Sequence, residues 1–213
     1  ENGGINMFYP ERKKLRLSGY DYSQPGAYFI TICTHNRECL FGKINDGKMF
    51  LNDIGEIAKQ CWLEIPNHFP NVSLDEFVIM PNHIHGIIIL NDNTNFQNNV
   101  GVQNFEPLQK PPQRNQFQKI IPRSVGSIIR GYKIGVTKWC RQNVGAKNFS
   151  PLGEPPIHVW QRNYYEHIIR NAHALQRIRQ YIVDNPMKWE LDMENTNATK
   201  HQINHHYQML TEA

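Results

Sequence analysis

The sequence predicts a single α+β domain in which strands and helices alternate along the chain. Apolar runs rich in β-branched and aromatic residues indicate strands, at residues 28–34, 76–80 and 83–90. Apolar residues at helical spacing indicate helices, at residues 51–65, 123–141 and 172–185. A length of 213 residues suits one domain, and a hydrophobic content of 39% is enough for one core of modest size.

The predicted strands are separated by recognisable turns. An Asp-Gly pair at Asp46 follows the first strand and is typical of tight hairpin turns. Pro81 and Asn82 join the second strand directly to the third. Because so short a connection reverses the chain, the second and third strands are expected to form an antiparallel hairpin.

Each predicted helix has one apolar face. The first can be capped by Asn52 or Asp53, and the last ends at Pro186 because proline disfavours helical backbone in the residue before it. The middle helix carries a basic stripe opposite its apolar face: Arg123, Arg130, Lys133 and Arg141. A solvated face is the ordinary interpretation of such a stripe, but beside a site that handles phosphodiesters it is a candidate clamp for a nucleic-acid backbone.

Composition divides the chain into a core domain and polar flanks. Residues 1–16 form a basic N-terminal arm, residues 17–190 the single domain, and residues 191–213 a polar C-terminal tail. Residues 91–118 are dominated by Asn, Gln and Pro and are too poor in apolar residues to organise a core. This stretch is predicted to be an exposed loop inserted into the domain.

Charge and cysteine usage limit the environment of the protein. A net charge of +4 permits a nucleic-acid partner without requiring one. No run of 18 apolar residues is present, which excludes a membrane-spanning helix, and the start of the chain lacks an apolar signal segment. The four cysteines have no metal-binding spacing and are interpreted as buried structural thiols. A cytoplasmic location is therefore expected.

The third strand opens with His83 and His85, separated by one apolar residue. Alternate side chains of a strand share a face, so the two imidazoles point the same way. Two neighbouring imidazoles supply half of a metal site. A histidine pair at the start of a strand is, on its own, more often structural, so this interpretation depends on finding further ligands.

The last helix offers both a third ligand and a nucleophile. Tyr181 and Asn185 are four residues apart and therefore lie one above the other, with Arg177 and Arg170 expected on the same face. Two imidazoles and a neutral amide oxygen would hold a divalent cation without cancelling its charge, which suits an anionic phosphodiester. Attack by the Tyr181 hydroxyl on phosphorus would give a covalent phosphotyrosine.

Each of these residues also has an ordinary explanation. Tyr181 is also explained as a half-buried tyrosine, and Asn185 as a residue that ends a helix before proline. Rival nucleophiles are Tyr164 and Tyr165, and His167 is a rival ligand. The aromatic residues Trp160, Tyr164 and Tyr165 suit either base stacking or core packing.

Three segments together resemble a known family. They are Met80-Pro81-Asn82-His83-Ile84-His85-Gly86, Trp160-Gln161-Arg162-Asn163-Tyr164-Tyr165-Glu166-His167, and Tyr181-Ile182-Val183-Asp184-Asn185-Pro186-Met187-Lys188-Trp189. In this order and spacing the sequence resembles the single-tyrosine HUH transposases of the IS200/IS605 type, and more closely the REP-associated tyrosine transposases. The resemblance spans residues 17–189, interrupted by the Asn/Gln-rich insert.

The resemblance implies a fold and a reaction. It implies a ferredoxin-like or RRM-like antiparallel sheet with packed helices, and cleavage of single-stranded or hairpin DNA that leaves a 5′-phosphotyrosine and a free 3′-OH. It implies Mg²⁺ or Mn²⁺ on His83, His85 and Asn185, with Tyr181 as nucleophile. Relatives often carry Gln where this chain has the shorter Asn185. A homodimer is expected, with a monomer as the alternative. The residues expected to contact DNA are Arg123, Arg130, Lys133, Arg141, Trp160, Gln161, Arg162 and Arg177.

Three classes of function remain open at this point. The leading hypothesis is metal-dependent DNA nicking and strand transfer through Tyr181. The second is a non-catalytic protein that binds single-stranded or hairpin nucleic acid with the same basic and aromatic residues. The third is an unrelated metallohydrolase that uses His83 and His85 with water as the nucleophile.

Overall fold

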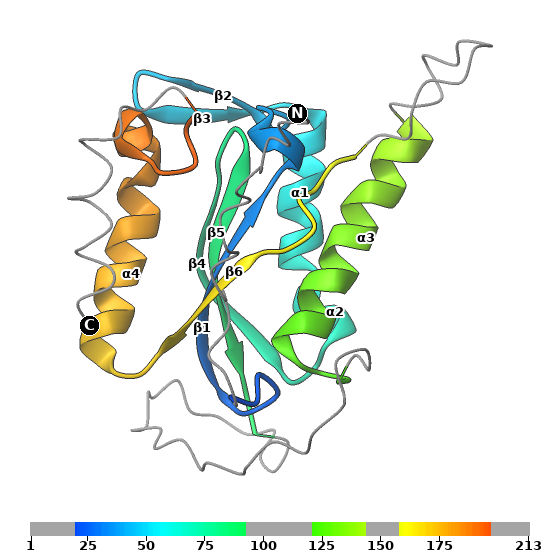
Figure 1. Ribbon diagram of the computed structural model, residues 1–213, viewed down its shortest axis with the longest axis vertical. Coiled ribbons are helices and arrows are strands. Elements are labelled where there is room, and N and C mark those ends of the chain that lie inside the picture. The colour runs from blue at the N-terminus through cyan, green and yellow to red at the C-terminus, as the bar shows by residue number, and fades with distance from the viewer. Residues whose placement is uncertain (1–19, 93–120, 144–157, 197–213) are drawn as a thin grey trace, which may run out of the picture.

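A four-stranded antiparallel sheet with helices on both faces forms the centre of the computed structural model, which describes residues 20–92, 121–143 and 158–196 (Figure 1). The strands lie in the order β4-β5-β1-β6. Their bounds are β1 Gly26–Cys33, β4 Val72–Ile79, β5 His83–Leu90 and β6 Tyr165–Ile169. This order, with a helix after β1 and another after β5, is the ferredoxin-like arrangement. The predicted α+β class and antiparallel sheet are confirmed.

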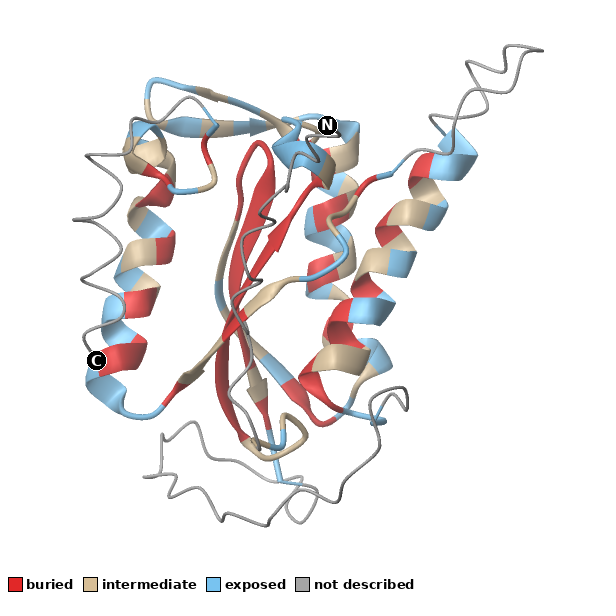
Figure 2. Ribbon diagram, in the orientation of Figure 1, coloured by how far each residue is buried: buried red, intermediate tan, exposed pale blue. Residues whose placement is uncertain are grey.

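The central strands β1 and β5 are buried on both faces, as Figure 2 shows by their red colour. They pair antiparallel in a register that sets Cys33 opposite His83 and Thr31 opposite His85. Because side chains alternate along a strand, Ile84 and Ile88 face one side of the sheet and the two histidines face the other. The predicted hairpin of β4 and β5 is confirmed by their antiparallel pairing.

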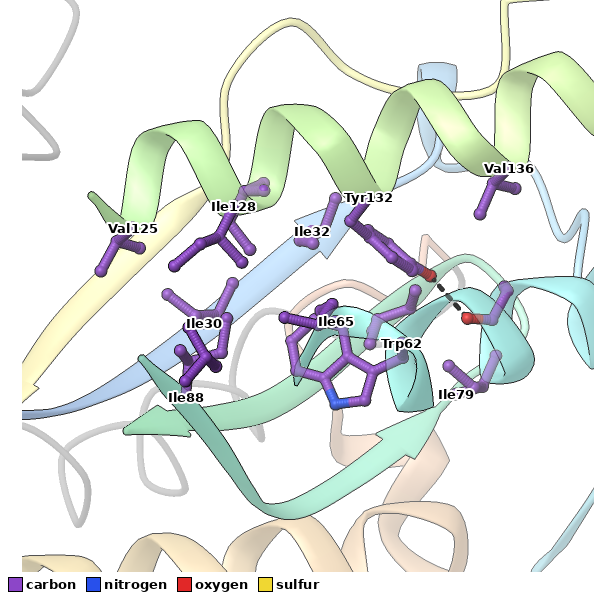
Figure 3. Packing of buried hydrophobic residues seen from close by; sticks show 14 of the residues in the cluster. Ile30, Ile32, Trp62, Ile65, Ile79, Ile88, Val125, Ile128, Tyr132 and Val136 are labelled. Atoms are coloured by element: carbon purple, nitrogen blue, oxygen red, sulfur yellow. Dashed lines mark hydrogen bonds between the residues drawn. The ribbon is translucent and has the colours of Figure 1, made fainter. Parts of the chain in front are cut away.

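One face of the sheet is covered by α1 (Asp53–Leu63), the short α2 (Ile65–His68) and α3 (Val125–Asn143). Figure 3 shows Ile128 of α3 and Trp62 of α1 packed over Ile30 and Ile88 of the sheet. The hydroxyl of Tyr132 donates to the Ala58 carbonyl oxygen at 3.1 Å, so this buried phenol keeps a hydrogen-bond partner. The main core therefore lies between these helices and the sheet.

The opposite face carries α4 (Ala172–Asp184), which continues into a 3-10 helix, η3 (Asn185–Leu191) (Figure 1). Leu175, Ile178 and Ile182 form the buried stripe of α4, as their spacing predicts. They pack against Phe29 and Ile87, which project from the centre of the sheet. The Asn171 side chain caps α4 by accepting from the Ala174 amide at 2.8 Å. This second core fixes α4 beside the two histidines.

The predicted helices are found close to their predicted positions. Asn52 is the N-cap of α1, since its side chain accepts from the Gly55 amide at 3.0 Å. Two residues at the ends of the predicted range belong to other elements: Leu51 ends β3 (Lys48–Leu51), and Ile65 begins α2. β3 pairs with β2 (Gly42–Asn45) in a separate two-stranded hairpin around the predicted Asp-Gly turn.

Strand β6 was not among the predicted strands. Its sequence, Tyr-Glu-His-Ile-Ile, places a charged residue at a position that the fold buries, and Glu166 is 4% exposed. The pairing with β1, and not a local sequence pattern, determines that this segment is a strand. Ahead of β6 in the sequence, an isolated antiparallel bridge pairs Trp160 with Thr34.

The chain continues past the predicted end of the domain at residue 190. Helix η3 extends to Leu191, and the next residues fold back against the histidine strand, with Asp192 and Asn195 buried. The start of the predicted tail is therefore part of the packed structure, because its polar side chains find partners there. The predicted arm (1–16), most of the insert (91–118) and residues 197–213 lie outside the described residues.

Candidate functional site

The two histidines of β5 lie together on the α4 face of the sheet, as the alternation of side chains predicts. Their ring centroids are 4.4 Å apart, and His83 and His85 are 0% and 3% exposed. Two buried imidazoles this close are not both protonated, because two adjacent positive charges would repel each other in a medium of low dielectric.

The orientation of the His83 ring is set by Asn82. The Nδ1–H of His83 donates to Asn82 Oδ1 at 2.8 Å. The amide nitrogen of Asn82 in turn donates to the carbonyl oxygens of Arg37 and Glu194, at 3.2 and 2.7 Å. Since Asn82 Oδ1 can only accept, the proton of neutral His83 resides on Nδ1, and Nε2 presents its lone pair. A metal ligand requires this tautomer, and such a hydrogen bond is its usual support.

The His85 ring is held by three neighbours. Its Nδ1 lies 2.9 Å from Thr31 Oγ1 on the adjacent strand. Phe29 stacks against it with ring centroids 5.3 Å apart. Its Nε2 lies 3.1 Å from the hydroxyl of Tyr181 on α4. The predicted nucleophile and the predicted ligand pair, almost one hundred residues apart in sequence, thus meet at hydrogen-bond distance.

A carboxylate completes the group. Asp192 is 2% exposed, and its Oδ2 lies 3.7 Å from Nε2 of His83 and 3.8 Å from Nε2 of His85. Its other oxygen accepts from the Glu194 amide at 2.6 Å. Among the described residues, these three are the His, Cys, Asp or Glu side chains whose ligand atoms gather within 4.8 Å of one another.

Sequence reasoning missed Asp192 because it lies in the stretch interpreted as the tail. The turn after η3 brings it to the site: the Asp192 amide donates to the Trp189 carbonyl oxygen at 3.2 Å. The ion pair of Arg37 with Glu194, at 2.6 Å, ties the same segment to the loop after β1. Three acidic residues follow the Tyr181 helix closely in the sequence, Glu190, Asp192 and Glu194, and no local pattern marks Asp192 as the buried one.

Burial and charge set the protonation states of the site. Burial, aided by the neighbouring His85, lowers the pKa of His83 from 6.5 to about 3. Burial acts to raise the pKa of Asp192, but the two imidazoles and the Glu194 amide outweigh it and hold that pKa below its usual value. Near neutral pH the group therefore consists of a neutral imidazole beside an ionised carboxylate, which are the forms that bind metal.

Asn185 lies at the junction of α4 and η3, four residues after Tyr181. It is 2% exposed, and its Oδ1 has no hydrogen-bond partner. A buried amide oxygen without a partner costs roughly 1–3 kcal/mol unless something occupies it. Its assignment as the third ligand stays a prediction.

The residues of the site fit a divalent cation. Buried acceptor atoms without a hydrogen bond include His83 Nε2, Asp192 Oδ2 and Asn185 Oδ1. Imidazole nitrogen with carboxylate and amide oxygen is a ligand set that Mn²⁺, Mg²⁺ or Zn²⁺ accepts. An ion bound between the two histidines and Asp192 would give His83 Nε2 and Asp192 Oδ2 the partners that the protein alone does not provide.

A second candidate feature lies on the outer face of α3, on the opposite side of the sheet. It is a hollow of about 800 Å³ whose lining includes Arg130, Lys138, Arg141, Arg162 and Tyr164. Among the residues that the structure describes, no acidic side chain lines it. The predicted stripe residues Arg130 and Arg141 and the predicted contact Arg162 thus share one basic groove. Arg123 is exposed and precedes α3.

Three predicted DNA contacts have structural partners in this region. The Lys133 ammonium donates to the carbonyl oxygens of Gln161 and Asn163, at 2.8 and 3.0 Å, and burial lowers its pKa to about 8. The Trp160 indole donates to the Lys133 carbonyl oxygen at 3.1 Å and packs on Phe41. Lys133, Trp160 and Gln161 therefore hold the loop that carries Arg162.

The rival residues separate across the sheet. Tyr164 lines the α3 groove, whereas Tyr165 packs against Phe29 on the α4 face, with ring centroids 6.4 Å apart. Tyr181 is the tyrosine placed at 3.1 Å from His85. Arg177 is exposed on α4, and Arg170, expected on the same helical face, instead follows β6 before the helix begins.

No model of a known protein family matches the chain. In structure the chain is similar to a REP-associated tyrosine transposase bound to a REP hairpin, with 19% identity and a TM-score of 0.48 over 81% of this chain and 74% of that one. It is also similar to a Deinococcus radiodurans protein provisionally named a transposase, with 13% identity and a TM-score of 0.40 over 79% and 95% of the two chains.

Among the described residues, no helix is long and apolar enough to cross a membrane.

A curated relative, an uncharacterized protein of Haemophilus influenzae, is 45% identical over 191 residues, which cover 90% of this chain and 94% of that protein. Identity at this level over nearly the whole length of both proteins establishes common descent. The chain belongs to the same protein family as this Haemophilus influenzae protein.

Proposed function

We propose that this protein is a metal-dependent enzyme that nicks single-stranded DNA and transfers the strand through a covalent bond to Tyr181. The observation that carries the proposal is the Tyr181 hydroxyl, 3.1 Å from Nε2 of His85, within a buried group that has the composition of a metal site. Two of the three sequence segments that resemble single-tyrosine HUH transposases contribute Tyr181, His83 and His85 to this group.

The residues of the chain have distinct tasks in this reaction. The phenolic oxygen of Tyr181 attacks phosphorus, the bond from phosphorus to the 3′ oxygen of the preceding nucleotide breaks, and a 5′-phosphotyrosine forms. The phenolic proton is lost and the departing oxygen gains one, so the products are the adduct and a 3′-OH. Attack by a second 3′-OH on the adduct reverses these steps and joins the strands.

A divalent cation fits this scheme. His83, His85 and Asp192 would hold it, with Asn185 as a further candidate ligand. When bound, the ion supplies Lewis-acid polarisation of the phosphate. The centroid of the Phe29 ring lies 5.3 Å from that of His85 and 6.0 Å from that of Tyr181. Phe29 therefore packs on both rings and holds the nucleophile beside this ligand.

The basic groove on α3 is the proposed grip on the remainder of the DNA. Arg130, Lys138, Arg141 and Arg162 supply positive charge, and the described part of the lining contains no acidic side chain. Such a surface binds phosphates without regard to sequence and makes binding salt-dependent. Three further statements are also proposals: the DNA substrate forms a hairpin, the protein is a homodimer, and the chain divides into an arm, a domain and a tail.

The test is a covalent-adduct assay with Mn²⁺ and a single-stranded hairpin oligonucleotide labelled at either end. The 3′-labelled fragment is expected to migrate with the protein in denaturing gels, and the 5′-labelled fragment to be released with a free 3′-OH. Tyr181→Phe is expected to abolish the adduct. The matched control is Tyr165→Phe, which removes a half-buried hydroxyl from the same face of the sheet.

The other outcomes separate the alternatives. An adduct that survives Tyr181→Phe would refute the proposal. DNA binding without any cleavage by the unmodified protein would favour a non-catalytic nucleic-acid-binding protein. Cleavage that persists in Tyr181→Phe without an adduct, and is lost in His83→Ala, would favour a metallohydrolase with water as the nucleophile.

A further inference from the structure

The β2–β3 hairpin has two chemically different faces. Side chains alternate strictly between exposed and half-buried along both strands. Lys43 pairs with Phe50, and Asn45 pairs with Lys48, so these four exposed residues share one face. Ile44 pairs with Met49 on the other face. The outer face of the hairpin is therefore Lys43, Asn45, Lys48 and Phe50.

The hairpin is a rigid support for this outer face. Asp46 and Gly47 both have positive φ, 48° and 69°, which is the geometry of a type I′ turn. Met49 and Leu51 of its inner face pack against the main core. At Gly42 (φ 141°) an added Cβ would lie 2.0 Å from the Phe50 carbonyl oxygen, so the two strands approach too closely there for any other residue. Two strands alone would be marginally stable, and these contacts supply the missing support.

The outer face combines charge with an exposed aromatic ring. Phe50 is 52% exposed, although burying a phenylalanine side chain is ordinarily favourable by roughly 1.5–3 kcal/mol. Lys43 and Lys48 are exposed and form no ion pair with the residues that the structure describes. An aromatic ring flanked by two free ammonium groups suits a nucleotide, whose base stacks on the ring while its phosphates meet the lysines.

The hairpin lies one element away from the histidine site. Its turn touches η3, since a Cβ added at Gly47 would lie 3.2 Å from Met187 Cγ. The same helix carries Trp189, whose ring stacks on His83 with centroids 6.0 Å apart. Figure 1 shows the hairpin beyond the end of α4, at the end of the sheet where β5 begins. A strand held on the hairpin is thus close to the site.

We infer that the outer face of the β2–β3 hairpin is a contact surface for single-stranded DNA, with Phe50 as a stacking platform and Lys43 and Lys48 as phosphate contacts. The inference rests on the proposed function for the identity of the ligand. It adds a surface separate from the α3 groove, formed by a two-stranded sheet that is not joined to the main one.

The experiment measures the affinity of a short oligo(dT), by fluorescence anisotropy over a range of salt concentrations, in the Tyr181→Phe background so that no cleavage intervenes. Phe50→Ala is compared with Leu63→Ala, because Leu63 is a large apolar side chain of similar exposure, 51%, that lies on α1 instead of the hairpin. Lys43→Gln and Lys48→Gln are compared with Lys59→Gln, an exposed lysine also on α1.

Loss of the stacking platform is expected to weaken binding about tenfold. Each lysine variant is expected to reduce the salt dependence of log K by about 0.7, the value for one phosphate contact on a single strand. Photo-cross-linking of an oligonucleotide that contains 5-iododeoxyuridine is expected to label Phe50. The Leu63 and Lys59 controls are expected to bind like the parent protein.

Affinities of the hairpin variants equal to those of the controls would overturn the inference, as would a change in oligomeric mass on Phe50→Ala, which would mark this face as an interface between copies of the chain. Failure of the proposed function is distinguishable. Without any adduct from the wild-type protein, a loss of affinity in Phe50→Ala would still support the hairpin surface. With an adduct but no loss of affinity, the inference alone fails.

Discussion

His83 is the residue whose surroundings say most about the site. Its Nδ1 proton is committed to Asn82, its Nε2 is buried without a hydrogen bond, and its pKa of about 3 keeps it neutral. A histidine serving only the core would be expected to use both ring nitrogens, since a buried polar atom without a partner is costly. The arrangement is explained by a ligand on Nε2.

The lowered pKa of His83 predicts how stability depends on pH. The unfolded chain takes up a proton near pH 6.5 and the folded chain only near pH 3. Stability is therefore complete above about pH 6.5 and falls as the pH drops toward 3, by up to roughly 1.4 kcal/mol per pH unit. Urea unfolding in EDTA between pH 7 and pH 4 should show this slope. His83→Gln should flatten it and His35→Gln, at a half-buried site, should not.

Asp192 carries a negative charge and Asn185 does not, so replacing these two candidate ligands is expected to change Mn²⁺ binding differently. Asp192→Asn keeps the size of the side chain and removes its charge, so the affinity for Mn²⁺ is expected to fall at least tenfold. Asn185→Ala tests the amide oxygen in the same calorimetric titration. Asp184→Asn, which alters a half-buried carboxylate paired with Lys188 instead, is the control. An Asp192→Asn variant that binds Mn²⁺ as the control does would remove Asp192 from the site.

Strand β5 depends on a close approach that only glycine permits. A Cβ at Gly86 would lie 2.3 Å from the Trp62 ring, which covers the strand on the face opposite to His85. Gly86→Ala is expected to destabilise the protein by about 1–3 kcal/mol, the usual cost of overpacking. On α3, by contrast, a Cβ at Gly131 would make ordinary contact with Phe69 at 3.5 Å.

Gly131→Ala is therefore the matched control, and is expected to stabilise the protein by up to about 1 kcal/mol through helix propensity. Chemical unfolding of the two variants measures both effects. Equal stability of the two variants would mean that Trp62 moves aside without cost. Repeating the unfolding measurement in the presence of Mn²⁺ would show whether overpacking at Gly86 also changes metal binding by the histidines.

At the scale of the molecule, the sheet separates the two candidate sites. The Tyr181 site lies on the α4 face and the basic groove on the α3 face. Arg130→Glu combined with Arg141→Glu should therefore weaken hairpin-DNA binding and lower its salt dependence, by roughly 0.9 per phosphate contact for duplex DNA. Mn²⁺ binding should not change. Lys59→Glu is the control, and a loss of Mn²⁺ binding in the double variant would show that the two faces are coupled.

The sequence by itself determined the strands and helices with strong periodicity and the face that the two histidines share. Alternation along β5 is a local property, so it places His83 and His85 on one side without knowledge of the fold. The spacing of Tyr181 and Asn185 on α4 is local in the same sense.

Only the tertiary structure decided which of these groups meet. It brought the Tyr181 hydroxyl to His85 and made a strand of Tyr165–Ile169. It also brought Asp192, which the sequence analysis assigns to a tail, into the histidine site. Each of these depends on contacts between residues far apart in the chain, which no local pattern records. Burial is the physical reason, since it decides which polar atoms lose water and must find a partner, a proton or an ion.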